Sequence, residues 1–64
     1  MNEEQMIEML RSHLKAAKML NWDSGKMSFI DGFLQAINLM FNKEYGFMGT
    51  TVYLEDENGK MKRV

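Results

Sequence analysis

The chain contains no cysteine, and this absence excludes disulfide bonds and thiolate metal sites. Its single histidine leaves no multi-histidine metal site either. A chain of 64 residues buries only about 60% of the surface that its unfolded form exposes, so domains of this size often depend on disulfides, metals or oligomerisation. Of these devices, self-association is the one that the composition leaves open.

An excess of one charge sign is also missing, because nine acidic residues stand against eight basic ones. The net charge of −1 provides no strong attraction to nucleic acid or to an anionic membrane. No apolar run approaches the roughly 20 residues that span a bilayer. The first residues, Met-Asn-Glu-Glu, are acidic, whereas a signal peptide begins with basic residues. We therefore expect one small cytoplasmic domain over residues 1–64, with no membrane partner.

Residues 3 to 20 are predicted to form a helix, because their apolar side chains recur on one side. At about 100° per residue, most of them fall within one arc of roughly 160°. This arc contains Met6, Ile7, Met9, Leu10, His13, Leu14, Ala17 and Leu20. Acidic residues in the first turns and basic residues in the last complement the helix dipole. Asn21 is suited to end this helix.

A second helix is predicted over residues 24 to 45. Its N-cap is either Asp23 or Ser24, or else Ser28. The earlier start is favoured because the apolar stripe begins before Ser28. Gly46 is expected to end the helix in a left-handed conformation.

The apolar side chains of this second helix cover about half of its circumference, which is more than one helix contact requires. They are Met27, Phe29, Ile30, Phe33, Leu34, Ala36, Ile37, Met40 and Phe41. We therefore expect the helix to contact two neighbours, the first helix on one flank and a hairpin on the other. The opposite side is polar, and we expect it to be solvated rather than a contact surface: Asp31, Gln35, Asn38 and Asn42.

Small residues recur every fourth position of the second helix, at Ser28, Gly32 and Ala36. Small side chains allow another helix to approach closely, whereas a mid-helix Gly costs roughly 1 kcal/mol relative to Ala. The favoured interpretation is a close approach of the first helix, and the alternative is a second copy of the chain.

A β-hairpin is predicted from strands over residues 48–56 and 60–64, joined at Asn58-Gly59. This pair is the strongest two-residue turn signal, because both turn positions need positive φ. The expected cross-strand pairs are Glu57 with Lys60, Glu55 with Lys62, and Tyr53 with Val64. The residues expected to face the helices are Val52, Leu54 and Met61. The predicted fold class is α+β: two antiparallel amphipathic helices followed by a C-terminal β-hairpin.

No catalytic residue, cofactor site or metal site is predicted. His13 could serve as a general base or pH switch, but no Ser, Cys or Asp is spaced to complete a triad, so a partly buried His is favoured. The segment from Asp56 to Gly59 lacks the ligand spacing of a calcium loop. We therefore expect that the chain is not an enzyme and has no small-molecule substrate.

The leading hypothesis is a small interaction module that binds a protein partner or a second copy of itself. Met is common at adaptable binding surfaces and aromatic residues at binding hot spots. The candidate partner-binding residues are Trp22, Phe29, Phe33, Met40, Thr51 and Tyr53. Of these, Thr51 and Tyr53 belong to a β-prone run, residues 49–53, that has no Pro or Lys to block pairing at a free sheet edge. The Met-rich, Cys-free chain suits an accessory or regulatory protein of a bacterium or its phage.

The alternative is a small nucleic-acid-binding transcriptional regulator. Lys60, Lys62 and Arg63 form a short basic end. A recognition helix, however, needs Lys or Arg for phosphate contacts, and the outward side of the second helix has one acid and no base. Nucleic acid is therefore the less favoured partner.

Overall fold

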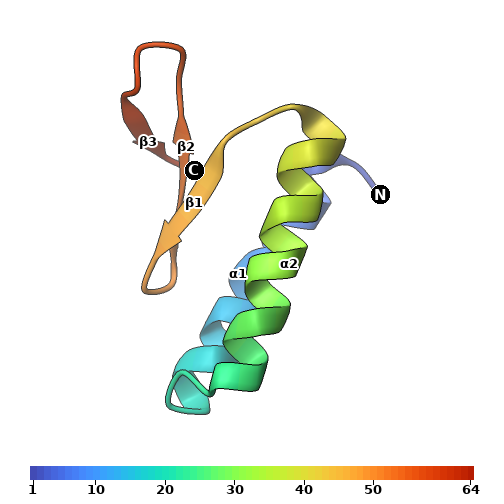
Figure 1. Cartoon of the computed structure of the whole chain (residues 1–64), viewed down its shortest axis with the longest axis vertical. Coiled ribbons are helices and arrows are strands. Elements are labelled where there is room, and N and C mark those ends of the chain that lie inside the picture. The colour runs from blue at the N-terminus through green and yellow to red at the C-terminus, as the bar shows by residue number, and fades with distance from the viewer.

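The computed structural model describes residues 1–64 and begins with two antiparallel helices, α1 (Glu3–Met19) and α2 (Ser24–Phe41) (Figure 1). A three-stranded antiparallel sheet follows, in the order β1 (Tyr45–Met48), β2 (Thr51–Glu55), β3 (Met61–Arg63). The predicted α+β class, with helices followed by C-terminal strands, is confirmed, and β1 is an additional strand. Neither helix is long and apolar enough to cross a membrane.

Helix α1 is capped at both ends by local hydrogen bonds. The Asn2 side chain accepts from the Gln5 N–H (2.8 Å), and the Gln5 side chain accepts from the Asn2 N–H (3.0 Å), which forms a capping box. After the helix, Asn21 has a φ of 55°, and the Trp22 N–H donates to the Ala17 carbonyl at 2.7 Å. This is a Schellman ending with Asn21 as its left-handed residue, as its position in the sequence suggests.

Helix α2 starts where the sequence favours but ends earlier than predicted. Asp23 is the N-cap, because its carboxylate accepts from the Lys26 N–H at 3.1 Å. The helix ends at Phe41 because Asn42 adopts a left-handed conformation (φ 51°), which Asn tolerates better than other residues with a side chain. The predicted end near residue 45, with Gly46 as the cap, is therefore wrong.

The earlier end of α2 releases residues 45–48 to form β1, a strand that the hydrophobic pattern did not predict. A two-residue turn joins β1 to β2, and only its first position, Gly49, has a positive φ (60°), which is the type II′ pattern. Asn38 of α2 binds the other side of β1. Its Oδ1 accepts from the Tyr45 N–H (2.7 Å), and its Nδ2 donates to the Tyr45 carbonyl (3.1 Å). Asn38 is therefore a partly buried structural residue, not the solvated one predicted.

Strands β2 and β3 pair one residue out of the predicted register. The observed partners are Tyr53 with Arg63, Leu54 with Lys62, and Glu55 with Met61. The predicted ion pairs of Glu55 with Lys62 and Glu57 with Lys60 do not form; the two ion pairs present are in other parts of the fold.

The turn between these strands explains the shifted register. The Asp56 carboxylate accepts from the N–H groups of both Asn58 and Lys60 (2.9 Å each), and Gly59 alone has a positive φ (77°). This turn has three loop residues with a left-handed Gly at its end, instead of the two-residue turn predicted at Asn58-Gly59.

The one-residue shift exchanges the faces of β3, as the period-two alternation of a strand requires. The Val64 N–H donates to the Val52 carbonyl at 3.0 Å, so Val64 shares the helix-facing side with the fully buried Val52. Met61 lies opposite Glu55 on the outer side and is 56% exposed. The predicted inward position of Met61 is therefore wrong.

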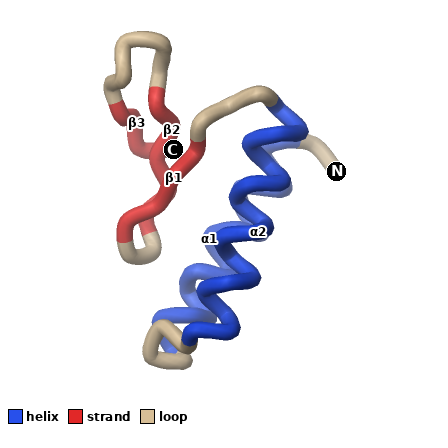
Figure 2. The backbone as a smooth tube through the Cα atoms, viewed as in Figure 1, coloured by secondary structure: helices blue, strands red, loops and turns tan.

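The core lies between the helix pair and the sheet, which forms a second layer on one side of the helices (Figure 2). Its buried members come from α1, α2 and β2: Ile7, Leu10, Leu14, Ala17, Ile30, Ile37 and Val52. All of them are aliphatic. The Phe and Met side chains lie at the margin of this core or outside it, so the largest apolar groups of the chain remain partly or largely exposed.

Candidate protein-binding face of the helix pair

Helix α2 contacts both neighbours that its apolar surface predicts, α1 and the sheet. Ile30 and Ile37 point into the core, Asn38 binds β1 and Phe33 contacts His13 of α1. Successive residues step by about 100°, so the side of α2 that lies next to Phe33 and away from the sheet has no neighbour in the chain except where Phe29 and Phe33 contact His13. We call this side the outer α2 face: Phe29, Gly32, Phe33, Ala36 and Met40.

The outer α2 face is apolar and carries no charged side chain. Phe29 is 51% exposed and Met40 is 59% exposed, while Phe33 packs partly against the core. Leu39, at its margin, is 85% exposed. An uncharged apolar surface rimmed by polar residues is typical of a protein interface.

Small residues on this face do not contact α1. A Cβ atom placed on Gly32 would meet no atom within 4 Å, and Ala36 is exposed. The favoured interpretation of the small-residue ridge, a close approach of the first helix, is therefore wrong. The space beside Gly32 is open to another molecule.

An aromatic cluster lies where the outer α2 face meets α1. The rings of Phe29 and Phe33 are stacked at 6.0 Å, and His13 makes edge contacts with them at 4.8 Å and 5.8 Å respectively. Such contacts hold each ring in a preferred geometry. The cluster therefore presents an ordered aromatic surface to solvent.

Lys26 completes this cluster. Its Nζ lies 2.7 Å from His13 Nδ1 and 5.2 Å from the centre of the Phe29 ring. Because an ammonium group only donates, the neutral His13 is the acceptor in this contact. Partial burial, and then the Lys26 charge, lower the pKa of His13 from its ordinary value of 6.5. The site therefore favours an uncharged imidazole.

The other predicted partner-binding residues lie elsewhere. Trp22 follows α1 in the connecting loop, where it is 39% exposed. Thr51 and Tyr53 belong to β2, whose backbone pairs with β1 on one side and β3 on the other. The predicted free edge is therefore not at β2. Phe29, Phe33 and Met40 are the three predicted residues that the fold brings together.

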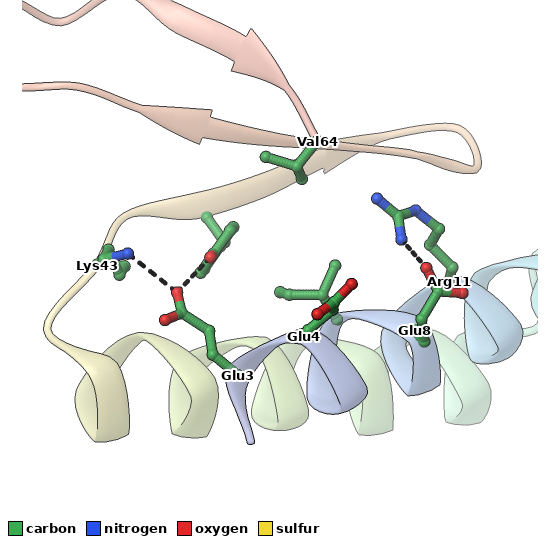
Figure 3. Close-up of a pocket in the computed structure, with 8 residues that line it drawn as sticks. Glu3, Glu4, Glu8, Arg11, Lys43 and Val64 are labelled. Atoms are coloured by element: carbon green, nitrogen blue, oxygen red, sulfur yellow. Dashed lines mark hydrogen bonds and ion pairs between the residues drawn. The ribbon is translucent and has the colours of Figure 1, made fainter. Parts of the chain in front are cut away.

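A cleft of about 590 Å³ separates the N-terminal half of α1 from the sheet (Figure 3). Glu3 accepts from the Tyr45 hydroxyl and from Lys43 Nζ at 3.1 Å, and these bonds, the Tyr45 bond first, lower the pKa of Glu3. Burial, and then Glu3, raise the pKa of Tyr45 to about 12. Glu8 and Arg11 pair with each other at its far side. Within this cleft, Glu3 thus joins α1 to Tyr45 of β1 and to Lys43 of the segment before it.

A second cleft, of about 680 Å³, lies beside the β2–β3 turn, and four of its eight lining residues are acidic. A hydrogen bond in which protonated Glu55 donates to Glu44, and then the nearby Glu44 charge, raise the pKa of the Glu55 carboxyl. No three His, Cys, Asp or Glu side chains in the structure are placed to hold a metal ion.

Sequence reasoning missed the bonds between Glu3, Tyr45 and Lys43, and those between Asn38 and Tyr45. The first set joins residues about 40 positions apart, and no local pattern indicates such a contact. The only available signal for Asn38 was its amide within the polar, almost uncharged stripe of α2 that also includes Asp31. No protein-family model matches the chain, and no curated protein or solved structure is significantly similar to it.

Proposed function

We propose that the chain is a non-enzymatic interaction module whose outer α2 face binds a second copy of itself. The observation that carries this proposal is the uncharged strip of exposed apolar residues beside the open space at Gly32. The chain exposes 4624 Å², compared with about 4,200 Å² for a typical folded monomer of its 7.5 kDa mass. Burying this face would remove part of that excess.

A second copy fits this face because it is uncharged and its large and small side chains complement each other. If two α2 helices pack antiparallel about an axis between Gly32 and Ala36, Gly32 faces Ala36 of the second copy. Phe29 then reaches Leu39 and Met40 of the second copy. Small residues at the crossing let the helices approach closely, and larger ones pack on either side. Two-fold dimers with such a self-complementary patch are the commonest soluble oligomers.

Two substitutions that each add one negative charge test the proposal. Ala36→Glu places a carboxylate within the outer α2 face, and Gln35→Glu places one on the exposed side next to it. In sedimentation equilibrium, we expect the wild type and Gln35→Glu to form dimers with rising concentration and Ala36→Glu to stay monomeric. A wild type that remains monomeric at millimolar concentration would contradict the proposal, as would an equal effect of both substitutions.

We also propose a cytoplasmic location and a regulatory role, of the accessory type found in a bacterium or its phage. The absence of cysteine supports the location. The role is supported by small size together with an apolar face that has no cover in the single chain. Fractionation of cells that make the intact protein tests the location, and recovery in a membrane or secreted fraction would contradict it.

A further inference from the structure

The two edges of the sheet differ in whether their backbone groups are free. On β1, Gly46 and Met48 bond to β2, so Tyr45 and Phe47 direct their N–H and C=O groups outward. The Asn38 side chain binds both outward groups of Tyr45, at 2.7 Å and 3.1 Å. This side chain occupies the position of a neighbouring strand at Tyr45, so the β1 edge is closed at that residue and only Phe47 keeps outward groups without a partner.

The β3 edge is open. Lys62 pairs with Leu54, and backbone bonds join Lys60 to Asp56 and Val64 to Val52. In an antiparallel ladder the alternate residues point the other way, so Met61 and Arg63 direct their N–H and C=O groups outward. No hydrogen bond in the structure uses these outward groups. Residues 60–64 are all exposed.

This open edge is also basic. Lys60, Lys62 and Arg63 lie along it, and neither ion pair of the fold involves them. Within the turn, the Asp56 carboxylate already accepts two backbone N–H groups. Three exposed cations within four residues therefore remain available to an acidic partner.

We propose that the β3 edge binds an extended acidic peptide segment of another protein as a fourth strand. The outward groups of Met61 and Arg63 would form the backbone ladder, and acidic side chains at alternate positions of the peptide would lie beside Lys60 and Lys62, which share one face of the sheet. This is strand addition, in which the backbone provides affinity and alternate side chains provide selectivity. The β3 edge is separate from the outer α2 face, so the proposal does not depend on dimer formation.

A second copy of the chain does not suit this edge. Antiparallel pairing of two β3 strands centred on Lys62 would place the two Lys62 side chains directly opposite each other. Like charges in that position destabilise a strand pair, and edge lysines are a common protection against self-pairing. The same lysines would attract a strand of alternating acidic residues.

Titration of the intact protein with peptides of alternating Glu and Val, and of alternating Lys and Val, tests the proposal. We expect the Glu peptide to bind and the Lys peptide not to bind. In NMR hydrogen exchange, the amides of Met61 and Arg63 should gain protection only with the Glu peptide. A Glu peptide N-methylated at alternate amides should lose binding, because it cannot complete the ladder.

Matched charge variants locate the site. Lys62→Glu should weaken binding of the Glu peptide by about tenfold, since it replaces a cross-strand attraction with a repulsion. Lys15→Glu, which makes the same charge change on the exposed side of α1, should leave binding unchanged. Binding without protection of Met61 and Arg63 would overturn the proposal. So would tighter binding of a single-stranded oligonucleotide than of the Glu peptide, because that result would assign the cations to nucleic acid.

Discussion

At the scale of single residues, His13 links the folding of the chain to pH near neutrality. Its neutral imidazole accepts from Lys26 and packs against Phe29 and Phe33. Because its pKa is lower in the folded chain than the ordinary value of 6.5, the folded state binds fewer protons than the unfolded state in this range. The stabilisation from neutral His13 is therefore complete above pH 6.5 and is lost as the pH falls through the folded pKa.

We expect the free energy of unfolding of the wild type to fall on acidification from about pH 8 to pH 5, the range in which a His titrates. His13→Gln, which keeps an acceptor for Lys26 but does not titrate, should lose this part of the slope. Urea denaturation at each pH gives the free energy of unfolding of both proteins. Subtracting one from the other removes the contribution of Glu55, whose raised pKa makes stability change with pH in the opposite direction. Equal slopes for both proteins would contradict the assignment to His13.

Gly32 provides a second test at the residue scale, because it separates folding from association. A methyl group at this position meets no atom of the same chain. Gly32→Ala should therefore raise the free energy of unfolding by about 0.5–1 kcal/mol, the usual gain for a mid-helix position. The measurement uses urea denaturation in the Ala36→Glu background, where the chain is expected to be monomeric.

The same Gly32→Ala substitution without Ala36→Glu should weaken dimer formation, since the methyl group would keep the two α2 helices apart. Sedimentation equilibrium should therefore show weaker dimer formation, whereas urea denaturation of the monomer should show a higher free energy of unfolding. If the substitution instead destabilises the monomer, a neighbour within the chain must occupy the space beside Gly32.

At the scale of elements, the ends of α2 and the turns decide how the sheet is built. Asn42 stops the helix about one turn before the predicted end, and the residues so released form β1. Asp56 sets the β2–β3 register through two bonds to backbone N–H groups of its turn. The presence of β1 therefore depends on Asn42, and the register between β2 and β3 depends on Asp56.

Asn38 joins α2 to the sheet, and its removal tests that connection. Asn38→Ala would leave the outward N–H and C=O of Tyr45 without partners in a partly buried place, so we expect a loss of about 1–3 kcal/mol in the free energy of unfolding. Urea denaturation measures the loss, and amide exchange should speed up first in β1. Gln35→Ala, at an exposed position of the same helix, is the control and should change stability little. Equal effects of the two substitutions would show that Asn38 does not hold β1.

At the scale of the whole molecule, the fold has two layers and covers only one side of the helix pair. The sheet packs on that side (Figure 2). The buried core is limited to seven aliphatic residues. A chain of this size supplies no third layer. The Phe and Met residues of α2 that a third layer would cover therefore remain exposed.

If a second copy supplies that cover, stability must depend on protein concentration. A tenfold increase in concentration stabilises the folded dimer by RT ln 10, which is about 0.7 kcal/mol per chain. We therefore expect the Tm of the wild type to rise by about 3–6 °C for each tenfold increase in concentration. The Tm of Ala36→Glu should not change with concentration. Thermal unfolding followed by circular dichroism over two decades of concentration measures both. A constant wild-type Tm would show that the single chain is the folding unit.

Much of the fold could be predicted from the sequence, because it follows from signals between near neighbours. The apolar period predicts both helices, Asp23 and Asn21 mark the start of α2 and the end of α1, and the turn residues near Gly59 indicate strands β2 and β3. The end of α2 was mistaken because Asn42 and Gly46 are both able to adopt a left-handed conformation, and the nearer one is used. The candidate site was predicted in part: Phe29, Phe33 and Met40 share one face, whereas Trp22, Thr51 and Tyr53 lie outside it.

The sequence by itself determined the helices, the class of the fold and the apolar half of α2, since each depends on periodicity and on caps within a few residues. Only the tertiary structure decided which part of that half is covered. It placed α1 and the sheet on adjoining sides of α2, left Gly32 facing open space and bound the outward groups of Tyr45 on the β1 edge to Asn38. The physical reason is that burial depends on which segments meet, and contacts such as Glu3 with Tyr45 join residues far apart in the chain. The two-helix and hairpin pattern thus describes the parts, whereas the free surfaces follow from their packing.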